Sequence, residues 1–446
     1  MLDNLTAARE QMAFSLGFHI IFAVFGMGLP WLLLYAEGRW LRTGDPLWYV
    51  LARRWSRAFA VLFAVGAVSG TVLSFEFGLL WPTFMERYGG VFGLAFTLEA
   101  FAFFLEAIFL GLYLYGWDRL PARWHWWTGV PVALSGMASA GFVTTANAWM
   151  NTPVGFTEVN GVVVSADPLA PLLAPATPHQ VVHMVLAALM CTGFGVAAVY
   201  ATAMLRDPAK RADPYHRRGL GLGLALAAAV TPLQLVVGDW AIRAVADRQP
   251  VKLAALEALH RTGPDAALAV GPVELPGVLS FLLHGRTDAV VTGLDAVPPA
   301  DRPPVGITHY SFDLMVAIGL GLLALSAWAA WRWRYRRADC FAAPWFLRAL
   351  AAAGPASVVA LIAGWIATEV GRQPWIVHLR LRTADAVATA PRLEWYLYAT
   401  LAIYAVLATS LVAILRRLAR TPIETRRPAG VSGPAGVRRT PAGVRR

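Results

Sequence analysis

The sequence predicts an all-α membrane protein that crosses the bilayer nine times. Of its 446 residues, 57% are hydrophobic and only 15% are charged, whereas soluble domains carry about 25% charged residues. Long apolar runs recur along the chain, and many of its 18 tryptophans stand near their ends, where aromatic residues favour the membrane–water interface. The net charge of +11 comes from arginines in the segments between these runs, so it indicates membrane topology and not nucleic-acid binding.

Nine apolar runs are long enough to cross the hydrocarbon core, which requires about 20 residues. The first run is longer than the core of a signal peptide and no small-residue cleavage site follows it, so we expect it to be retained. The two cysteines match no metal-ligand spacing and support no prediction. The predicted spans are 12–36, 57–81, 90–116, 126–150, 180–204, 218–243, 310–331, 347–370 and 393–416.

Basic residues gather in the odd-numbered connections between spans, whereas the fourth connection, 151–179, has no lysine or arginine. The positive-inside rule therefore places the N-terminus outside and the C-terminus in the cytoplasm. The sixth connection, 244–309, and the eighth, 371–392, then face outward. We divide the chain into a membrane domain, 1–420, which includes the outward loop 244–309, and a basic tail, 421–446, whose composition predicts disorder.

Polar side chains of unusual kinds stand inside five predicted spans. Histidine, methionine and carboxylate side chains can hold haem iron axially, and an acid inside a membrane is functional by default. Each also has a simpler interpretation, because a lone histidine is more often interfacial, a lone methionine packs, and a lone glutamate can pair with arginine. Zinc is less favoured, since no CxxC spacing is present. With the predicted orientation, five such residues meet in the outer half of the bilayer: His19, Glu99, His183, Met315 and Glu369.

Two further spacings place polar residues on common helix faces. Glu99 and Glu106 are seven residues apart, which is roughly 10 Å along a helix. Two carboxylates stepping inward on one face suit a proton relay, although they can also be two separately hydrogen-bonded acids. Trp365, Glu369 and Arg372 share one face at the end of the eighth predicted span, where a carboxylate is costly and needs a partner.

In these contexts, the residues resemble subunit I of the cytochrome bd family of quinol oxidases. The resemblance extends from the first span to about Ala388. Its four motifs all occur, in order, among the nine predicted spans, which makes the resemblance specific. The motifs that carry it are LEAFAFFLE at 98–106, ANAWMNTPVG at 146–155, KLAALE at 252–257 and GRQPW at 371–375.

The resemblance implies three haems: a low-spin haem b and a pair made of a high-spin haem b and a haem d. His183 and Met315 match the axial ligands of the low-spin haem. His19 and Glu369 match the ligands of the pair, and the sequence leaves open which of them holds haem d.

The resemblance also implies roles in proton transfer and quinol oxidation. Glu99 and Glu106 match carboxylates of the proton path. Lys252 and Glu257 match quinol-site residues of the outward loop, where Glu257 would accept a quinol hydroxyl proton and Lys252 would stabilise charge.

Trp365 and Arg372 match residues packed around the haems, with Arg372 as a partner for Glu369 or for haem propionates. The sequence departs from the best-known members in its short outward loop and at three positions. Glu76 replaces a usual glutamine, and His260 replaces a common aromatic residue. Asp313 replaces an arginine, which changes the charge by two beside the low-spin haem and should lower its potential.

The implied activity is oxidation of ubiquinol or menaquinol at the outer face of the bacterial cytoplasmic (inner) membrane, with reduction of O2 by protons drawn from inside. The implied partners are a multi-span subunit II, a very small third subunit and membrane lipid. One alternative is a bd-like haem protein that has lost quinol oxidation, against which Lys252 and Glu257 argue. The other is a proton-coupled transporter, although the internal repeats typical of transporters are not seen.

Overall fold

The computed structural model describes residues 3–337 and 339–421. Within these residues, nine helices are long and apolar enough to cross a membrane, so the predicted all-α class and the number of spans are confirmed. The predicted disordered tail lies, beyond Thr421, outside the described residues. The long helices are α1 (Asn4–Thr43), α2 (Pro46–Leu80), α3 (Pro82–Gly116), α4 (Ala122–Asn151), α5 (Thr177–Arg206), α6 (Pro214–Arg248), α9 (Val305–Tyr335), α10 (Pro344–Val370) and α12 (Glu394–Arg420).

Most of these helices continue beyond the spans that hydropathy predicts. Helix α2 begins at Pro46, well before the predicted start at 57, because Asp45 caps its first turn by accepting a hydrogen bond from the Leu47 amide. Asp213 caps α6 in the same way. An aspartate cap followed by proline is a strong helix start, whereas hydropathy detects only the part that crosses hydrocarbon. The predicted boundaries are therefore too narrow.

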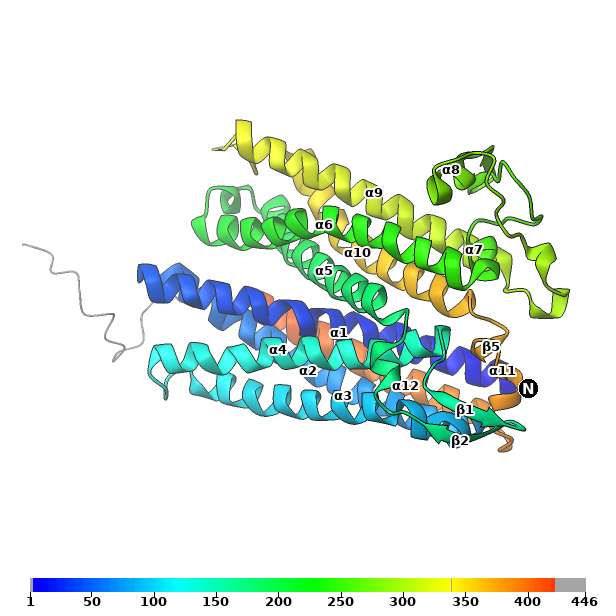
Figure 1. Ribbon diagram of the computed structural model, residues 1–446. Helices are drawn as coiled ribbons and strands as arrows, with labels where there is room; N and C mark the ends of the chain where they lie inside the picture. Colours follow the sequence, from blue (N-terminus) through cyan, green and yellow to red (C-terminus); the bar gives the residue numbers. More distant parts are fainter. Residues whose placement is uncertain (1–2, 338, 422–446) are drawn as a thin grey trace, which may run out of the picture.

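The long helices form two adjoining groups (Figure 1). In the first group, α1 packs against α2 and α4, and α3 packs against α4. In the second, α5 packs against α6 and α10, and α9 packs against α6 and α10. Helix α5 also contacts α1 and α4, so it joins the two groups, while α12 packs on α1 and α2.

Short elements gather with the N-terminus at one end of the bundle, which we call the loop-bearing end (Figure 1). The fourth, sixth and eighth connections all lie there, as the predicted topology requires of three loops that share one side of a membrane. Three antiparallel hairpins belong to these connections. The elements are β1 (Phe156–Val159), β2 (Val162–Ala166), η1 (Ala170–Leu173), α7 (Pro250–Leu256), β3 (Leu268–Val270), β4 (Val273–Leu275), α8 (Val278–His284), η3 (Leu294–Ala296), η4 (Pro299–Asp301), β5 (Trp375–Val377), β6 (Leu381–Arg382) and α11 (Thr383–Ala386). One further short helix, η2 (Pro208–Arg211), connects α5 to α6.

The sixth connection folds around a small apolar cluster of its own, which includes Leu253, Ala266 and Leu279. Its helix-like segment, VKLAALEALHRT in the sequence, is helical only as far as Leu256, where α7 ends. Ala258 follows with a φ of 50°, a left-handed conformation that a helix cannot continue through. The helix α7 therefore covers only the first half of this segment.

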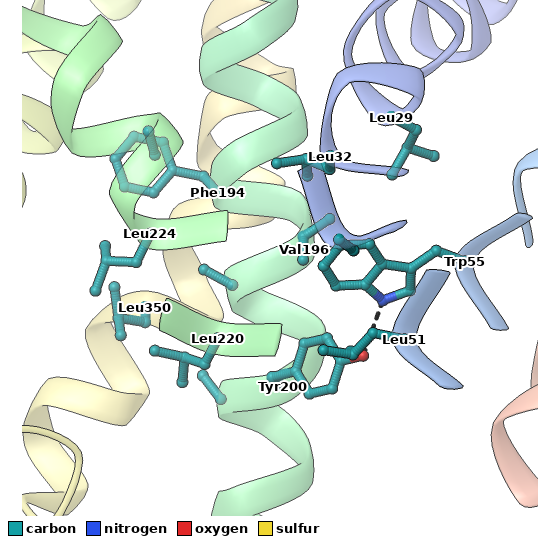
Figure 2. Close-up of a cluster of buried hydrophobic side chains, with 14 of the residues drawn as sticks. Leu29, Leu32, Leu51, Trp55, Phe194, Val196, Tyr200, Leu220, Leu224 and Leu350 are labelled. Carbon is teal, nitrogen blue, oxygen red and sulfur yellow. Dashed lines mark hydrogen bonds between the residues drawn. The ribbon is translucent and has the colours of Figure 1, made fainter. Parts of the chain in front are cut away.

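The most extensive apolar core lies toward the end of the bundle opposite the loops. It joins the late part of α1 and α5 to the early part of α2, α6 and α10 (Figure 2). Within it, the Trp55 indole donates a hydrogen bond of 2.8 Å to the Tyr200 hydroxyl, which satisfies a polar group that would otherwise be costly to bury. The residues labelled in Figure 2 are Leu29, Leu32, Leu51, Trp55, Phe194, Val196, Tyr200, Leu220, Leu224 and Leu350.

Candidate functional site

The predicted site residues lie mainly in the half of the bundle nearer to the loops. His19, His183 and Met315 stand in the early part of helices that begin at this end, and Glu369 stands at the end of α10, which finishes there. Glu99 lies midway along α3.

A small buried cluster connects three of the helices that carry these residues. Ile20 of α1, Met184 of α5 and Trp365 of α10 all belong to it. The segments that carry His19 and His183 are therefore brought together with α10 at one level of the bundle.

His183 and Met315 stand on the second helix group, each opposite a glycine. The Gln234 side-chain nitrogen of α6 lies 3.0 Å from His183 Nε2, and a Cβ at Gly238 would lie 3.6 Å from the ring. The Met315 sulfur lies against Gly364 of α10, where a Cβ would come within 2.6 Å of it. The sequence therefore makes room for the thioether by placing a glycine on the facing helix.

His19 faces α2, and its hydrogen bonds define its tautomer. Its Nδ1 lies 3.0 Å from the Ser69 hydroxyl oxygen, while that hydroxyl donates to the Gly66 carbonyl at 3.1 Å. Because a hydroxyl has a single proton, Ser69 must accept from His19 Nδ1. This leaves His19 Nε2 without a proton, which is the state that a metal-ligating imidazole needs.

Glu369 is held from two directions at the end of α10. Its Oε1 accepts a hydrogen bond from the Asn147 amide of α4, and its Oε2 pairs with Arg372. Trp365, four residues earlier on α10, lies in the buried cluster described above. Of the three residues that the sequence places on one face, Glu369 thus contacts both α4 and Arg372, and Trp365 packs in the buried cluster.

Glu99 and Glu106 of α3 both face α4. Glu99 accepts a 3.1 Å hydrogen bond from the Ser139 hydroxyl. The Glu106 carboxylate lies against Gly136, where a Cβ would come 3.0 Å from its Oε1, and this oxygen is buried without a partner among the described residues. The two acids therefore point along one interface, with Glu106 nearer to the apolar core.

A buried cluster that was not predicted from the sequence continues this interface. Glu37 and His125 are only 0% and 2% exposed, and His125 Nδ1 lies 2.6 Å from Glu37 Oε1. His125 Nε2 lies 2.8 Å from the Tyr113 carbonyl, and the Tyr113 hydroxyl donates to Glu37 Oε2 at 2.8 Å. Because the carbonyl can only accept, His125 donates from Nε2 and one proton must lie between His125 Nδ1 and Glu37.

One signal for this cluster was present in the sequence. Tyr113 follows Glu106 by the same seven-residue step that separates Glu106 from Glu99, so the three share one helix face. Glu37 lies just past the predicted first span, and its contact with His125 depends on the packing of α1 against α4.

Lys252 of α7 is buried at the loop-bearing end, where it is 6% exposed. Its ammonium donates to Asn151 Oδ1 at 3.0 Å and to the Thr368 carbonyl at 2.9 Å. Burial lowers the pKa of Lys252 to about 7, with the nearby Arg372 guanidinium as a second cause, while Glu369 acts in the opposite direction. The sixth connection is thus anchored to the end of α10, one residue before Glu369.

Glu257 follows α7 directly and is 4% exposed. Burial raises the pKa of Glu257 to about 7, with Asp313 as a second cause, while His309 acts in the opposite direction. Asp313 accepts a 2.6 Å hydrogen bond from the Gly271 amide in the β3–β4 turn, and His309 Nε2 lies 3.4 Å from it. Asp313, which stands where the best-known family members are described above as having arginine, therefore links the sixth connection to α9 by a hydrogen bond.

The other two departures differ in their surroundings. Glu76 is buried, and it accepts hydrogen bonds from Gln11 at 3.0 Å and from Ser15 at 2.8 Å. His260 is exposed. Only Glu76 thus alters the buried polar contacts between α1 and α2.

Comparison with known proteins decides the family. Residues 7–423 match the family model described as cytochrome bd terminal oxidase subunit I. The chain belongs to this family. It is 37% identical over 429 residues to a putative cytochrome bd menaquinol oxidase subunit I of Bacillus subtilis (strain 168), covering 93% of this chain and 96% of the relative. It is 30% identical over 442 residues to a cytochrome bd ubiquinol oxidase subunit 1 of the same organism, covering 93% of each.

The cytochrome bd fold is also shared with a solved structure. The bd oxidase from Geobacillus thermodenitrificans superposes with a TM-score of 0.87 at 37% identity, covering 94% of this chain and 98% of the solved chain. The chain is therefore a multi-pass membrane subunit of a terminal oxidase.

Membership of the cytochrome bd family implies haem cofactors and a second subunit, and the buried polar atoms of this chain fit haem. Arg372 is 4% exposed, yet its Nε and Nη1 atoms have no partner among the described residues. The Trp365 indole nitrogen is also buried without a hydrogen-bond partner among the described residues. Buried donors of this kind require an acceptor, and a guanidinium favours a carboxylate such as a haem propionate. His19, with a free Nε2, and Met315, facing a glycine, offer donors that iron accepts.

Proposed function

We propose that this chain is subunit I of a quinol:oxygen oxidoreductase in the bacterial cytoplasmic membrane, with its loop-bearing end outside. The observation that carries the proposal is the docking of Lys252 onto the Thr368 carbonyl, which joins the sixth connection to the helix end that holds Glu369 and Arg372. Relatives named as menaquinol and ubiquinol oxidases support the choice of quinol as the electron donor.

In this proposal, four side chains hold iron. His183 of α5 and Met315 of α9 would hold a low-spin haem b. His19 and Glu369 would hold a high-spin haem b and a haem d, with Arg372 and Trp365 beside them. When bound, these groups supply one-electron carriers and an iron that binds O2.

The quinol-oxidising residues belong to the loop 244–309, which we propose as the quinol-binding part of the membrane domain 1–420. Glu257 accepts the quinol hydroxyl proton and releases it outside. Its pKa of about 7 suits a general base at neutral pH. Lys252 stabilises the negative charge that develops on the quinol oxygen.

The protons for O2 reduction come from the opposite side of the membrane. Glu106 lies nearer to the cytoplasm in the predicted orientation, and Glu99 lies nearer to the candidate haem pair. Two quinols lose four electrons and four protons, and O2 takes up four electrons and four protons to give two waters. Because the protons are released outside and taken up inside, the reaction separates charge without a pump.

The proposed assembly contains subunit II, a very small third subunit and membrane lipid. The test is O2 uptake by the purified complex with ubiquinol and menaquinol analogues, together with its haem content. We expect quinol-dependent uptake that ceases when the quinol is exhausted. A complex that contains haem but shows no uptake with either quinol would instead support a bd-like protein that has lost quinol oxidation.

A further inference from the structure

Two asparagines of the ANAWMNTPVG segment have so far been given no role. Asn147 and Asn151 stand in the last turn of α4, four residues apart and therefore on one face. Asn151 is fully buried. They lie between two features described above, Glu369 at the end of α10 and Lys252 on α7.

An unbroken series of hydrogen bonds passes through these two side chains. The Asn147 amide donates to Glu369 Oε1, and Asn147 Oδ1 accepts from Asn151 Nδ2 at 3.1 Å. Asn151 Oδ1 then accepts from the Lys252 ammonium at 3.0 Å. Three elements that are far apart in the sequence, α4, α7 and α10, are linked by these contacts.

The orientation of Asn151 is fixed by its partners. Its amide nitrogen also donates to the Asn147 carbonyl at 3.0 Å, while its oxygen is also 3.4 Å from the Gln249 amide nitrogen. Both donor positions therefore face acceptors on Asn147, and the acceptor faces donors on or beside α7. An aspartate at this position would keep the acceptor for Lys252 but would place an oxygen against the acceptors of Asn147.

We propose that Asn147 and Asn151 form an asparagine bridge that positions Lys252 of the proposed quinol-binding loop relative to Glu369. One series of hydrogen bonds then sets the geometry of both the quinol site and the haem site. The proposal rests on the function proposed above and deepens it. Asn147 and Asn151 are positioning residues, because they act on the reaction through Lys252 and Glu369. Loss of either amide is expected to release Lys252 from its place at the end of α10.

The lysine content of the chain makes this directly measurable. The sequence contains two lysines, Lys210 and Lys252, and the Lys210 side chain is 39% exposed. Acetylation of the purified complex by acetic anhydride, quantified for both lysines by mass spectrometry, gives the reactivity of Lys252 with Lys210 as the internal reference. This readout does not depend on haem or on turnover.

We expect Lys252 to react slowly in the wild type, because it is buried and held by two acceptors. Asn151→Ala should raise its reactivity relative to Lys210 about tenfold, the effect of losing one hydrogen bond to a charged group. Asn147 does not contact Lys252, yet Asn147→Ala should also raise the ratio of Lys252 to Lys210 acetylation, because Asn151 would then be free to rotate. The matched control is Thr145→Ala, a buried residue of α4 whose hydroxyl donates only to the Phe142 carbonyl of its own helix; it should leave the ratio unchanged.

Steady-state kinetics of the same variants distinguish a failure of the asparagine bridge from a failure of the proposed function. In a quinol oxidase, Asn151→Ala should raise the KM for a quinol analogue about tenfold while kcat changes less than twofold. Asn147→Ala, which leaves the Asn151 acceptor for Lys252 in place but removes its link to Glu369, should also raise the KM, and it carries the test if Asn151→Ala does not assemble.

Unchanged Lys252 reactivity in both asparagine-to-alanine variants would overturn the bridge even if the wild type oxidises quinol. If Asn151→Ala does not assemble, unchanged Lys252 reactivity together with a wild-type KM in Asn147→Ala would overturn it as well. Conversely, raised Lys252 reactivity in both variants, with no O2 uptake by the wild-type complex, would support the bridge and reject the proposed function.

Discussion

Polar side chains at the loop-bearing half of the bundle take their chemical state from partners on neighbouring helices. Ser69 forces His19 to donate from Nδ1 and leaves its Nε2 free. Burial beside Arg372 brings the pKa of Lys252 down to about 7, and burial beside Asp313 brings the pKa of Glu257 up to about 7. The same positions on an isolated helix would have none of these properties.

His183→Ala tests the assignment of the low-spin haem. We expect the reduced spectrum to lose the low-spin b-type bands while the haem pair stays in place, because His19 and Glu369 stand on other helices. The control is His216→Ala, a histidine near the start of α6 that pairs with Asp213, which should retain all bands. Intact low-spin bands in the His183 variant would refute the assignment.

The pH dependence of quinol oxidation follows from Glu257 and Lys252. As pH rises through about 7, Glu257 loses its proton and becomes able to accept one, so kcat/KM should rise. Above about 7, Lys252 loses its charge, so kcat/KM should fall and the profile should be a narrow bell. Steady-state kinetics between pH 5 and 9, a range of about two units on each side, measure both limbs.

Glu257→Gln should remove the rising limb of this profile and lower kcat/KM about 100-fold, which is the lower range for loss of a general base. The exposed His260, three residues further on, supplies the control, since His260→Gln should leave the bell in place. A rising limb that persists in Glu257→Gln would assign the base to another group.

The buried contact between Glu37 and His125 makes a prediction about stability. Glu37→Ala leaves His125 without its partner in a fully buried site, and breaking such a pair costs about 3–5 kcal/mol. The thermal unfolding midpoint of the variant should fall clearly below that of Glu10→Gln, a substitution at an exposed position of the same helix. Equal midpoints would show that the pair contributes nothing to stability.

Among the elements, α5 and α6 approach each other most closely through glycines. A Cβ at Gly193 would lie 2.6 Å from the Ala227 nitrogen, and one at Gly223 would lie 2.8 Å from the Gly193 carbonyl oxygen. Small residues let membrane helices pack at short range. This contact positions α5, which carries His183, against α6, which carries Gln234.

Gly193→Ala should force these two helices apart and destabilise the protein by about 1–3 kcal/mol, the usual cost of overpacking. Gly221→Ala is the matched control, because its Cβ would meet nothing nearer than Phe341 at 4.0 Å. Thermal unfolding of both variants measures the difference. A midpoint for Gly193→Ala equal to that of Gly221→Ala would contradict the close approach.

The long helices were predictable because bilayer thickness imposes a length on each apolar run. Their ends were not, because caps such as Asp45 depend on single residues that hydropathy averages away. The sixth connection was less predictable still, since its fold depends on distant contacts such as that of Asp313 with Gly271. For the site, spacing placed Glu99 and Glu106 on one face, whereas the contact of Glu37 with His125 required knowledge of how α1 and α4 pack.

The whole molecule divides into an apolar half and a polar half along the bundle. The apolar half, which contains the Trp55–Tyr200 contact (Figure 2), holds the two helix groups together. The half at the loop-bearing end contains the candidate iron ligands, and the sixth connection, with α7 and α8, lies at this end of the bundle (Figure 1). The interface of α3 and α4, with Glu106, Tyr113 and His125, carries buried polar groups from one half into the other.

The proposed function requires iron held by His19, His183, Met315 and Glu369. The most direct measurement is the reduced-minus-oxidised absorption spectrum of the purified wild-type complex. We predict b-type haem bands together with the red-shifted chlorin band of haem d. A complex that is folded and assembled but shows no haem bands would contradict the proposed iron ligands.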